Sequence, residues 1–245
     1  MLDIQKILDN TTGLLIGGVP EGYDGVVLGQ LMETFKTVLF VARDDRRMAA
    51  VQESLSFFAD TAEVIEFPAW DCLPYDRVSP KSDIVAARID ALTKLVENNA
   101  HSSRIILTTV SALLQRVPAR QTFAGANMTF GKGGATSRDG LLEFMQQNGY
   151  GRCETVMEPG EYAIRGGIID LFPPGFEEPL RLDFFGDDLD GIRTFEPFSQ
   201  RSTGETDSFT LKPVNEISLD EEAISRFRTA YRALFGAGSS ADPLY

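Results

Sequence analysis

The sequence predicts an α/β protein in which a parallel-sheet domain is followed by a smaller antiparallel α+β domain. Two observations carry this prediction. In the first half of the chain, short apolar runs alternate with helical patterns, which is typical of parallel βαβ units. After about residue 121, short strand-like runs follow one another between turn residues, which is typical of antiparallel sheets.

The first domain is expected over residues 1–124. Its predicted strands are residues 14–17, 37–42, 63–67 and 104–109. Helices are predicted at residues 25–35, 44–58 and 82–98. In the last two, apolar side chains recur at steps of three or four residues and so share one face of the helix. These faces should pack against the sheet.

A glycine-rich loop joins the first predicted strand to the first helix. Gly17 and Gly22 have the spacing of a phosphate-binding P-loop, but Tyr23 occupies its lysine position and Asp24 its hydroxyl position. Tyr23 supplies no positive charge, and Asp24 repels a triphosphate. The loop is therefore either a P-loop that has lost its nucleotide or an ordinary glycine turn, because the chain has 22 glycines and this spacing arises easily by chance. We expect no cofactor.

Three prolines interrupt the alternating pattern between residues 67 and 80, and they exclude a regular element there. This loop contains Trp70, the one tryptophan of the chain. A long loop with this aromatic content is either functional or packed as a cover over another element. We favour packing.

The second domain is expected over residues 125–213. It should contain one amphipathic helix, residues 138–147, and strands at residues 153–157, 161–165, 168–172, 180–185 and 191–195. A third domain is expected to begin at residue 214 and to be cut short within residues 214–245. Its helix should carry an apolar stripe made of Ile224, Phe227, Tyr231 and Leu234.

Composition argues against several classes of protein. The 245 residues carry a formal charge of -13, which repels a nucleic-acid backbone but leaves room for a local basic patch. Cys72 and Cys153 are too few for a disulfide framework and fit a reducing cytoplasm. With His101 as the one histidine, neither a zinc site nor a catalytic triad is expected. No apolar run approaches the ~20 residues that a membrane helix needs.

Two long motifs, residues 68–80 and 158–175, together with residues 179–187 and 192–197, closely resemble the N-terminal region of the bacterial transcription-repair coupling factor family. The stretch from residue 158 also resembles the corresponding domain of the excision-repair helicase UvrB. The resemblance covers essentially the whole chain. Tyr23 in place of the P-loop lysine, and the lack of an aromatic β-hairpin insertion, favour the coupling factors over UvrB.

The resemblance implies three parts. Residues 1–124 would be a degenerate RecA-like domain without ATPase capacity, residues 125–213 a domain that binds UvrA, and residues 214–245 the start of a truncated further domain. The implied role is to recruit nucleotide excision repair to RNA polymerase stalled at DNA damage. The parent protein would be an ATP-dependent DNA translocase that also binds RNA polymerase and DNA, whereas this fragment is expected to have no enzymatic activity.

Side chains alternate between the two faces of the predicted strand at residues 180–185. The expected core face carries Leu180, Leu182 and Phe184. The other face carries Arg181, Asp183 and Phe185. From these residues alone, Phe185 packs under a neighbouring loop, and Arg181 pairs with Asp183 or a glutamate in solvent.

The resemblance changes this interpretation, because Arg165, Arg181 and Phe185 fall where the family places its UvrA contacts. Arginine and aromatic residues are also the types enriched at binding hot spots. Two other classes stay open. One is a nucleotide-binding protein or hydrolase that uses residues 17–24. The other is a DNA-binding module of a UvrB-type helicase, which would need a basic face.

Overall fold

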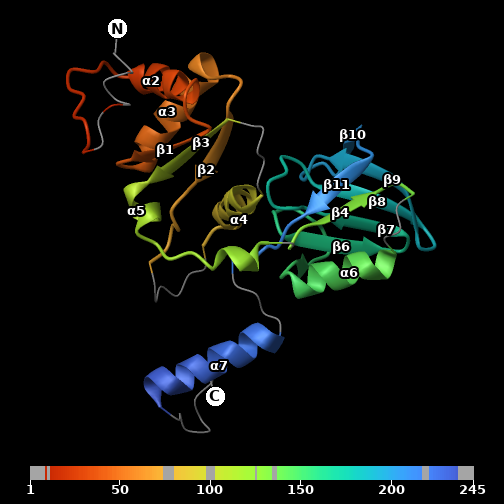
Figure 1. Cartoon of the computed structure of the whole chain (residues 1–245). Helices are drawn as coiled ribbons and strands as arrows, with labels where there is room; N and C mark the ends of the chain where they lie inside the picture. The colour runs from red at the N-terminus through yellow and green to blue at the C-terminus, as the bar shows by residue number, and fades with distance from the viewer. Residues whose placement is uncertain are drawn as a thin grey trace. The chain divides into compact units, whose positions relative to one another are not determined.

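A computed structural model describes residues 9, 12–73, 80–97, 103–124, 126–133, 137–216 and 221–236. The chain divides into two compact units, Met1–Val117 and Pro118–Tyr245. Figure 1 shows the first unit in red to yellow-green and the second in green to blue. One sheet is parallel and the others are largely antiparallel, so the predicted mixed α/β class is confirmed.

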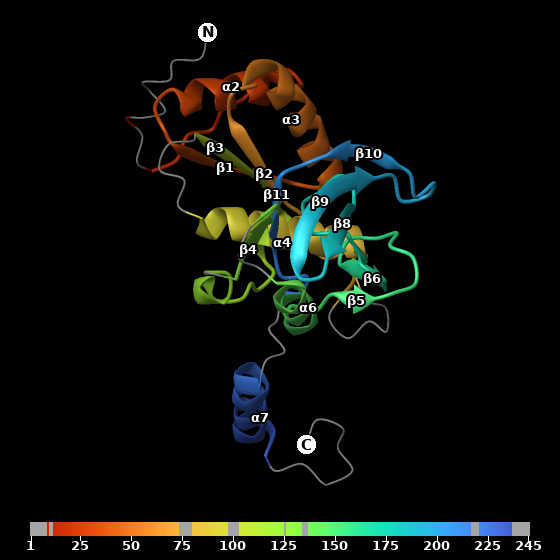
Figure 2. The same ribbon diagram turned by 90° about the vertical axis from the view of Figure 1, so that its right-hand side faces the viewer.

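The first unit is built on a parallel sheet in the order β1-β3-β2. Its strands are β1 (Thr37–Ala42), β2 (Glu63–Phe67) and β3 (Arg104–Thr109), as predicted. Helices α2 (Tyr23–Met32) and α3 (Asp45–Phe58) cover one face, and α4 (Ser82–Val96) covers the other (Figure 2). The short α5 (Val110–Leu113) follows β3. The core beneath α2 and α3 contains Leu28, Val51, Leu55, Ile105 and Leu107.

The predicted buried strand at residues 14–17 is wrong. The structure has no strand there, and the side chain of Leu15 is 96% exposed. Gly13 and Gly18 bracket the run with φ of 103° and 68°, left-handed conformations that turn the backbone at both ends of the run. An apolar run predicts burial only where a partner strand pairs with it, and no described strand pairs with this segment.

Two glycines of α2 allow it to approach α3 closely. A Cβ at Gly25 would lie 2.2 Å from the Ser54 Oγ, and one at Gly29 would lie 2.9 Å from the backbone oxygen of Phe58. A backbone oxygen cannot rotate away as the end of a side chain can. The helix pair therefore depends on these positions having no side chain.

We expect Gly29→Ala to destabilise the first unit by about 1–2 kcal/mol. Forcing a methyl group into a filled contact costs about 1–3 kcal/mol, which exceeds the ~1 kcal/mol that alanine gains over glycine within a helix. Urea unfolding measures the difference. The matched control is Gly17→Ala, where the new Cβ meets nothing within 4 Å. A Gly29→Ala protein as stable as the control would contradict this account.

The second unit contains a six-stranded sheet in the order β10-β9-β8-β7-β6-β5. Its strands are β5 (Gly151–Arg152), β6 (Glu161–Arg165), β7 (Ile168–Leu171), β8 (Leu180–Phe185), β9 (Asp188–Phe195) and β10 (Ser202–Glu205). Only the β5–β6 pair is parallel. A second sheet pairs β4 (Met128–Gly131) with β11 (Ser208–Leu211).

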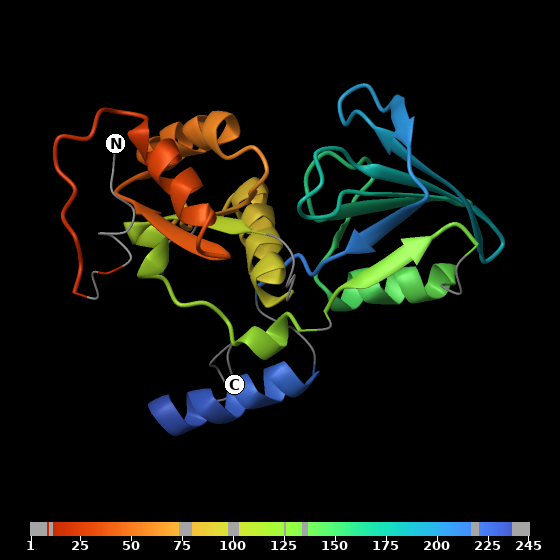
Figure 3. The ribbon, with the colours of Figure 1, turned by 45° about the horizontal axis from the view of Figure 1, so that its top comes forward.

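One face of the six-stranded sheet packs against α6 (Arg138–Gln147) and the β4/β11 sheet, forming the main core of the second unit. Figure 3 shows α6 running beside β4. Leu141 and Met145 of α6 meet Leu180 and Leu182 of β8, all four fully buried. The predicted core face of residues 180–185 is thus confirmed. The opposite face carries a smaller cluster of Val156, Ala163, Phe172 and Phe195.

The predicted strand at residues 153–157 is wrong, because β5 ends at Arg152. The reason is visible in the hydrogen bonds of this segment. The backbone N–H groups of Met157 and Glu158 donate to the Glu161 carboxylate at 2.8 and 3.0 Å, so a side chain replaces a strand partner. Val156 is still fully buried, which explains the apolar pattern that suggested a strand.

Two further helices lie in the described part of the chain. They are the short 3-10 helix η1 (Arg120–Thr122) and α7 (Glu221–Phe235). Helix α7 is a predicted element, but none of its residues is buried. Phe227 and Phe235 are 53% and 73% exposed and lie either side of the Tyr231 ring. The further domain expected from residue 214 stays a prediction.

Candidate functional site

The glycine loop of the first unit leads directly into α2, as predicted. Gly22 has φ of 84° and precedes the first helical residue, Tyr23. Asp24 in the first turn pairs with Arg47 of α3, and Glu21 lies 4.0 Å from the same guanidinium. The Ser54 Oγ donates to the Gly22 carbonyl at 2.7 Å. The Asp24 carboxylate at the start of α2 is therefore already paired with Arg47 within the protein.

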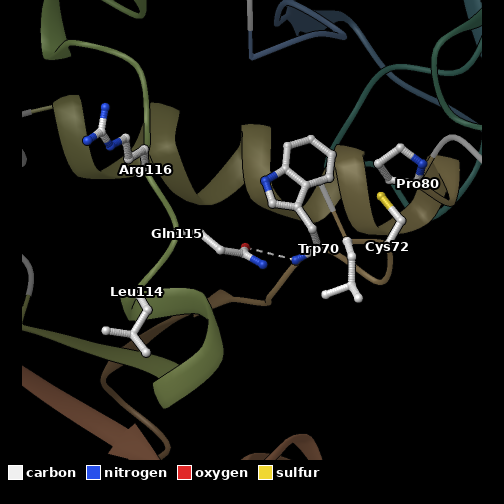
Figure 4. A pocket seen from close by; sticks show the side chains of 7 residues that line it. Trp70, Cys72, Pro80, Leu114, Gln115 and Arg116 are labelled. Atoms are coloured by element: carbon white, nitrogen blue, oxygen red, sulfur yellow. Dashed lines mark hydrogen bonds between the residues drawn. The ribbon is translucent and has the colours of Figure 1, made fainter. Parts of the chain in front are cut away.

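The loop around Trp70 is fastened by a buried arginine. The Arg88 guanidinium lies 4.3 Å from the Phe67 ring centroid and 4.6 Å from that of Trp70, and it donates to the Pro68 carbonyl and to Gln115 Oε1. Gln115 Oε1 also accepts from the backbone N–H of Trp70 at 3.0 Å, as Figure 4 shows. The packing interpretation is thus confirmed for the start of this loop, at Pro68 and Trp70, whereas residues 74–79 lie outside the described part of the chain.

Trp70 also borders an open hollow of about 560 Å³, whose walls include Leu114 and Arg116 (Figure 4). Leu73 and Pro80 line it as well, and the residues that join them, 74–79, lie outside the described part of the chain. We therefore assign it no ligand. Among the described residues, no cluster of acids, cysteines or histidines could hold a metal ion. His101 lies outside them.

The predicted contact residues Arg165, Arg181 and Phe185 lie on the face of the six-stranded sheet opposite α6, here called the outer face. Strand register defines two rows across it. The first row is Ala163, Asp170, Arg181 and Arg193. The second row is Arg165, Ile168, Asp183 and Gly191. The sheet thus brings Arg165 and Arg181 onto one surface, and Phe185 follows Asp183 by two residues along β8.

Arg181 is more buried than the sequence suggested. Its side chain is 15% exposed, and its Nε and Nη2 donate to the two carboxylate oxygens of Asp170 at 2.7 and 2.9 Å. The guanidinium also lies 4.5 Å from the Phe195 ring centroid. The hydrogen bonds that Arg181 donates to Asp170 raise the pKa of Arg181 above its ordinary value. The expectation that Arg181 pairs with Asp183 or a glutamate in solvent is therefore wrong.

Arg165 approaches the same carboxylate from the other side. Its Nη2 lies 3.4 Å from Asp170 Oδ2, and its side chain is 49% exposed. Asp170 itself is only 1% exposed. Two guanidinium groups thus share one carboxylate, whereas the nearby Arg193 and Asp183 form a balanced pair with contacts of 2.8–3.0 Å. The outer face has a local excess of positive charge at Arg165 and Arg181.

Phe185 ends β8 at the hairpin with β9. Gly186 follows it with φ of 65°, the conformation that the first central residue of a tight hairpin turn requires. The Phe185 side chain is 85% exposed, so it does not pack under a loop. An exposed aromatic side chain next to a tight turn, two residues along β8 from Asp183, is available to a partner.

A second exposed aromatic, Phe198, was missed by the sequence reasoning. It lies in residues 196–200, after β9, and is 86% exposed. The Glu196 carboxylate accepts from the backbone N–H groups of Phe198 and Ser199 at 2.9 and 2.6 Å. Hydrogen bonds from Ser199 and Phe198 hold the pKa of Glu196 below its usual value. The one sequence signal that could have identified Phe198 is its position between the turn-forming residues Pro197 and Ser199.

Comparison with known proteins gives this surface a context. Residues 128–217 match the UvrB interaction domain. The chain is 35% identical to a transcription-repair-coupling factor of Escherichia coli over 98% of its length, and 35% identical to one of Haemophilus influenzae over 91%. A third, of Myxococcus xanthus, is 31% identical over 86% of the chain. The resemblance identified from the two motifs is confirmed.

The chain spans about a fifth of the length of these relatives, 19% of the Haemophilus protein and 20% of the Escherichia protein. The region that matches the UvrB interaction domain contains every strand of the second unit and therefore the whole outer face. No helix within the described ranges is both long and apolar enough to cross a membrane.

Proposed function

We propose, from its similarity to part of the transcription-repair-coupling factors, that this chain binds UvrA through the outer face of its second unit. The role would be to recruit nucleotide excision repair to RNA polymerase stalled at DNA damage. The match of residues 128–217 to the UvrB interaction domain supports this partner. RNA polymerase and DNA would be partners of the longer parent protein.

The observation that carries the proposal is the shared carboxylate of Asp170. Because Arg181 already forms two hydrogen bonds with Asp170, Arg165 can turn to a carboxylate of a partner without leaving a buried charge unpaired. Arginine offers a planar set of donors that matches a carboxylate, and its charge does not titrate away. The exposed Phe185, at the hairpin end of β8, adds an apolar contact on the same sheet. The surface suits an acidic protein patch with an apolar pocket.

The first unit would be a degenerate RecA-like domain that performs no catalysis. Its parallel sheet and the helix that follows Gly22 fit this proposal. The lysine and hydroxyl of a P-loop are replaced by Tyr23 and Asp24.

We expect the chain not to bind Mg-ATP at micromolar concentrations. A helix N-terminus favours an anion, but Asp24 and Glu21 already place two carboxylates at the start of α2, and Arg47 faces them. Calorimetric titration with Mg-ATP should give no binding heat. Micromolar binding that Asp24→Lys alters would show that the loop still holds nucleotide.

Titration of the chain with purified UvrA tests the proposed function. We expect a saturable complex, and Arg165→Ala should weaken it because Arg165 is the more exposed of the two arginines on Asp170. Duplex DNA serves as the second titrant. Weak DNA binding at physiological salt is expected from the charge of -13. No UvrA binding, or submicromolar DNA binding that falls steeply with salt, would favour a DNA-binding module instead.

A further inference from the structure

The loop at residues 196–200 is held by hydrogen bonds between its own backbone groups and by hydrogen bonds to the Glu196 carboxylate. Besides the two N–H groups held by the Glu196 carboxylate, the Gln200 N–H donates to the Glu196 carbonyl at 2.8 Å. The Glu196 N–H donates to the Arg201 carbonyl at 3.0 Å. The backbone on both sides of Phe198 is therefore fixed.

Gln200 joins this loop to the outer face. Its Nε2 donates to the carbonyls of Pro197 at 2.6 Å and Val156 at 3.2 Å. Its φ is 58°, the one left-handed conformation found at a described residue other than glycine. Such a conformation persists only where the surroundings over-determine it.

Arg181 forms further hydrogen bonds between the sheet and this loop. Its Nη1 donates to the Gln200 carbonyl at 3.1 Å, and its Nη2 lies 3.3 Å from Gln200 Oε1. One guanidinium thus binds Asp170 on the sheet and Gln200 in the loop. The residue predicted as a partner contact is, in this structure, the link between the sheet and the loop that carries Phe198.

Folding alone does not explain an aromatic side chain that stays 86% exposed on a fixed backbone. Phe198 removes almost no apolar area from water within the chain, whereas burying it against a partner would remove most of its area. Because its backbone is already ordered, little conformational entropy remains to be lost on binding. Aromatic residues are among the types enriched at binding interfaces and their hot spots.

The distance between the two exposed aromatics fits one interface. Phe185 precedes β9 at the hairpin, and Phe198 follows β9 at its other end. The eight residues of β9 span about 24 Å at the usual rise per residue. A standard interface covers about 800 Å² on each partner, which is a patch about 30 Å across. Arg181 and Arg193 lie on the outer face between the two rings.

We propose that Phe198 is a second aromatic contact of the surface that binds UvrA, and that Arg181 is a positioning residue that holds the Phe198 loop. This inference rests on the proposed function. UvrA would then contact both ends of β9, with the aromatic rings flanking the arginines.

The test compares Phe198→Ala with Phe57→Ala, a control residue in the first unit that is 81% exposed. We expect Phe198→Ala to weaken binding of purified UvrA at least tenfold, with an unchanged Tm, and Phe57→Ala to bind as the wild type does. Arg181→Lys keeps the charge but loses the planar set of donors. If Arg181 acts through the Phe198 loop, the double variant will lose less affinity than the product of the two single losses, those of Arg181→Lys and Phe198→Ala.

The outcomes separate the two proposals. If the wild-type chain does not bind UvrA, the proposed function fails. If Phe185→Ala weakens binding but Phe198→Ala does not, the proposed function stands and this inference is overturned. Losses from Arg181→Lys and Phe198→Ala that multiply fully would show that Arg181 acts independently of the loop, which overturns its positioning role.

Discussion

Replacing Arg181 with alanine will destabilise the second unit by about 3 kcal/mol. The change removes both hydrogen bonds to Asp170, the stacking on Phe195 and the ties to Gln200. Breaking a buried ion pair by deleting one partner costs about 3–5 kcal/mol, because the other charge stays buried. Arg165 remains 3.4 Å from Asp170, which places the expected loss at the lower end. Urea unfolding at neutral pH measures it.

The control for this prediction is Arg193→Ala. Arg193 also pairs with an aspartate on the outer face, but the two side chains are 36% and 33% exposed, and exposed pairs contribute about 1 kcal/mol or less. If Arg181→Ala unfolds at the same urea concentration as Arg193→Ala, the Asp170 pair does not stabilise the sheet.

Replacing Phe185 with alanine will weaken UvrA binding about thirtyfold and leave the stability of the chain unchanged. Truncating a hot-spot aromatic costs about 2 kcal/mol or more, which corresponds to that factor. The side chain is 85% exposed and therefore contributes little to the folded core. Surface-immobilised UvrA gives the affinity, and thermal unfolding gives the stability. Wild-type affinity for Phe185→Ala would mean that UvrA does not use this end of β9.

Much of the fold could be predicted because periodicity records burial directly. The strands at residues 37–42, 63–67 and 161–165 were predicted to the residue, since each is a short run with several apolar side chains. Residues 14–17 carry the same apolar signal and failed. The apolar pattern predicts which side chains can be buried. Whether they are buried depends on a neighbouring strand, and no described strand pairs with residues 14–17.

The candidate site was predictable as a set of residues but not as an arrangement. Asp170 lies in the apolar run Ile168–Leu171, and nothing in that run names its partner. The pairing of Asp170 with Arg181 follows from the β7–β8 register. Eight residues, 172–179, separate the two strands, and a connection of that length does not fix a register as a tight turn would. For the same reason, the tie from Arg181 to Gln200 could not be seen in the sequence.

The sharing of Asp170 by two arginines has a consequence for the kinetics of association. Arg165, half-exposed and the weaker partner of Asp170, would attract an acidic surface from a distance, so the association rate should fall as ionic strength rises. Phe185 has no charge and acts only once the surfaces have met, so its loss should appear in the dissociation rate. Encounter and residence would thus be set by different side chains, on two strands of one sheet that β7 separates.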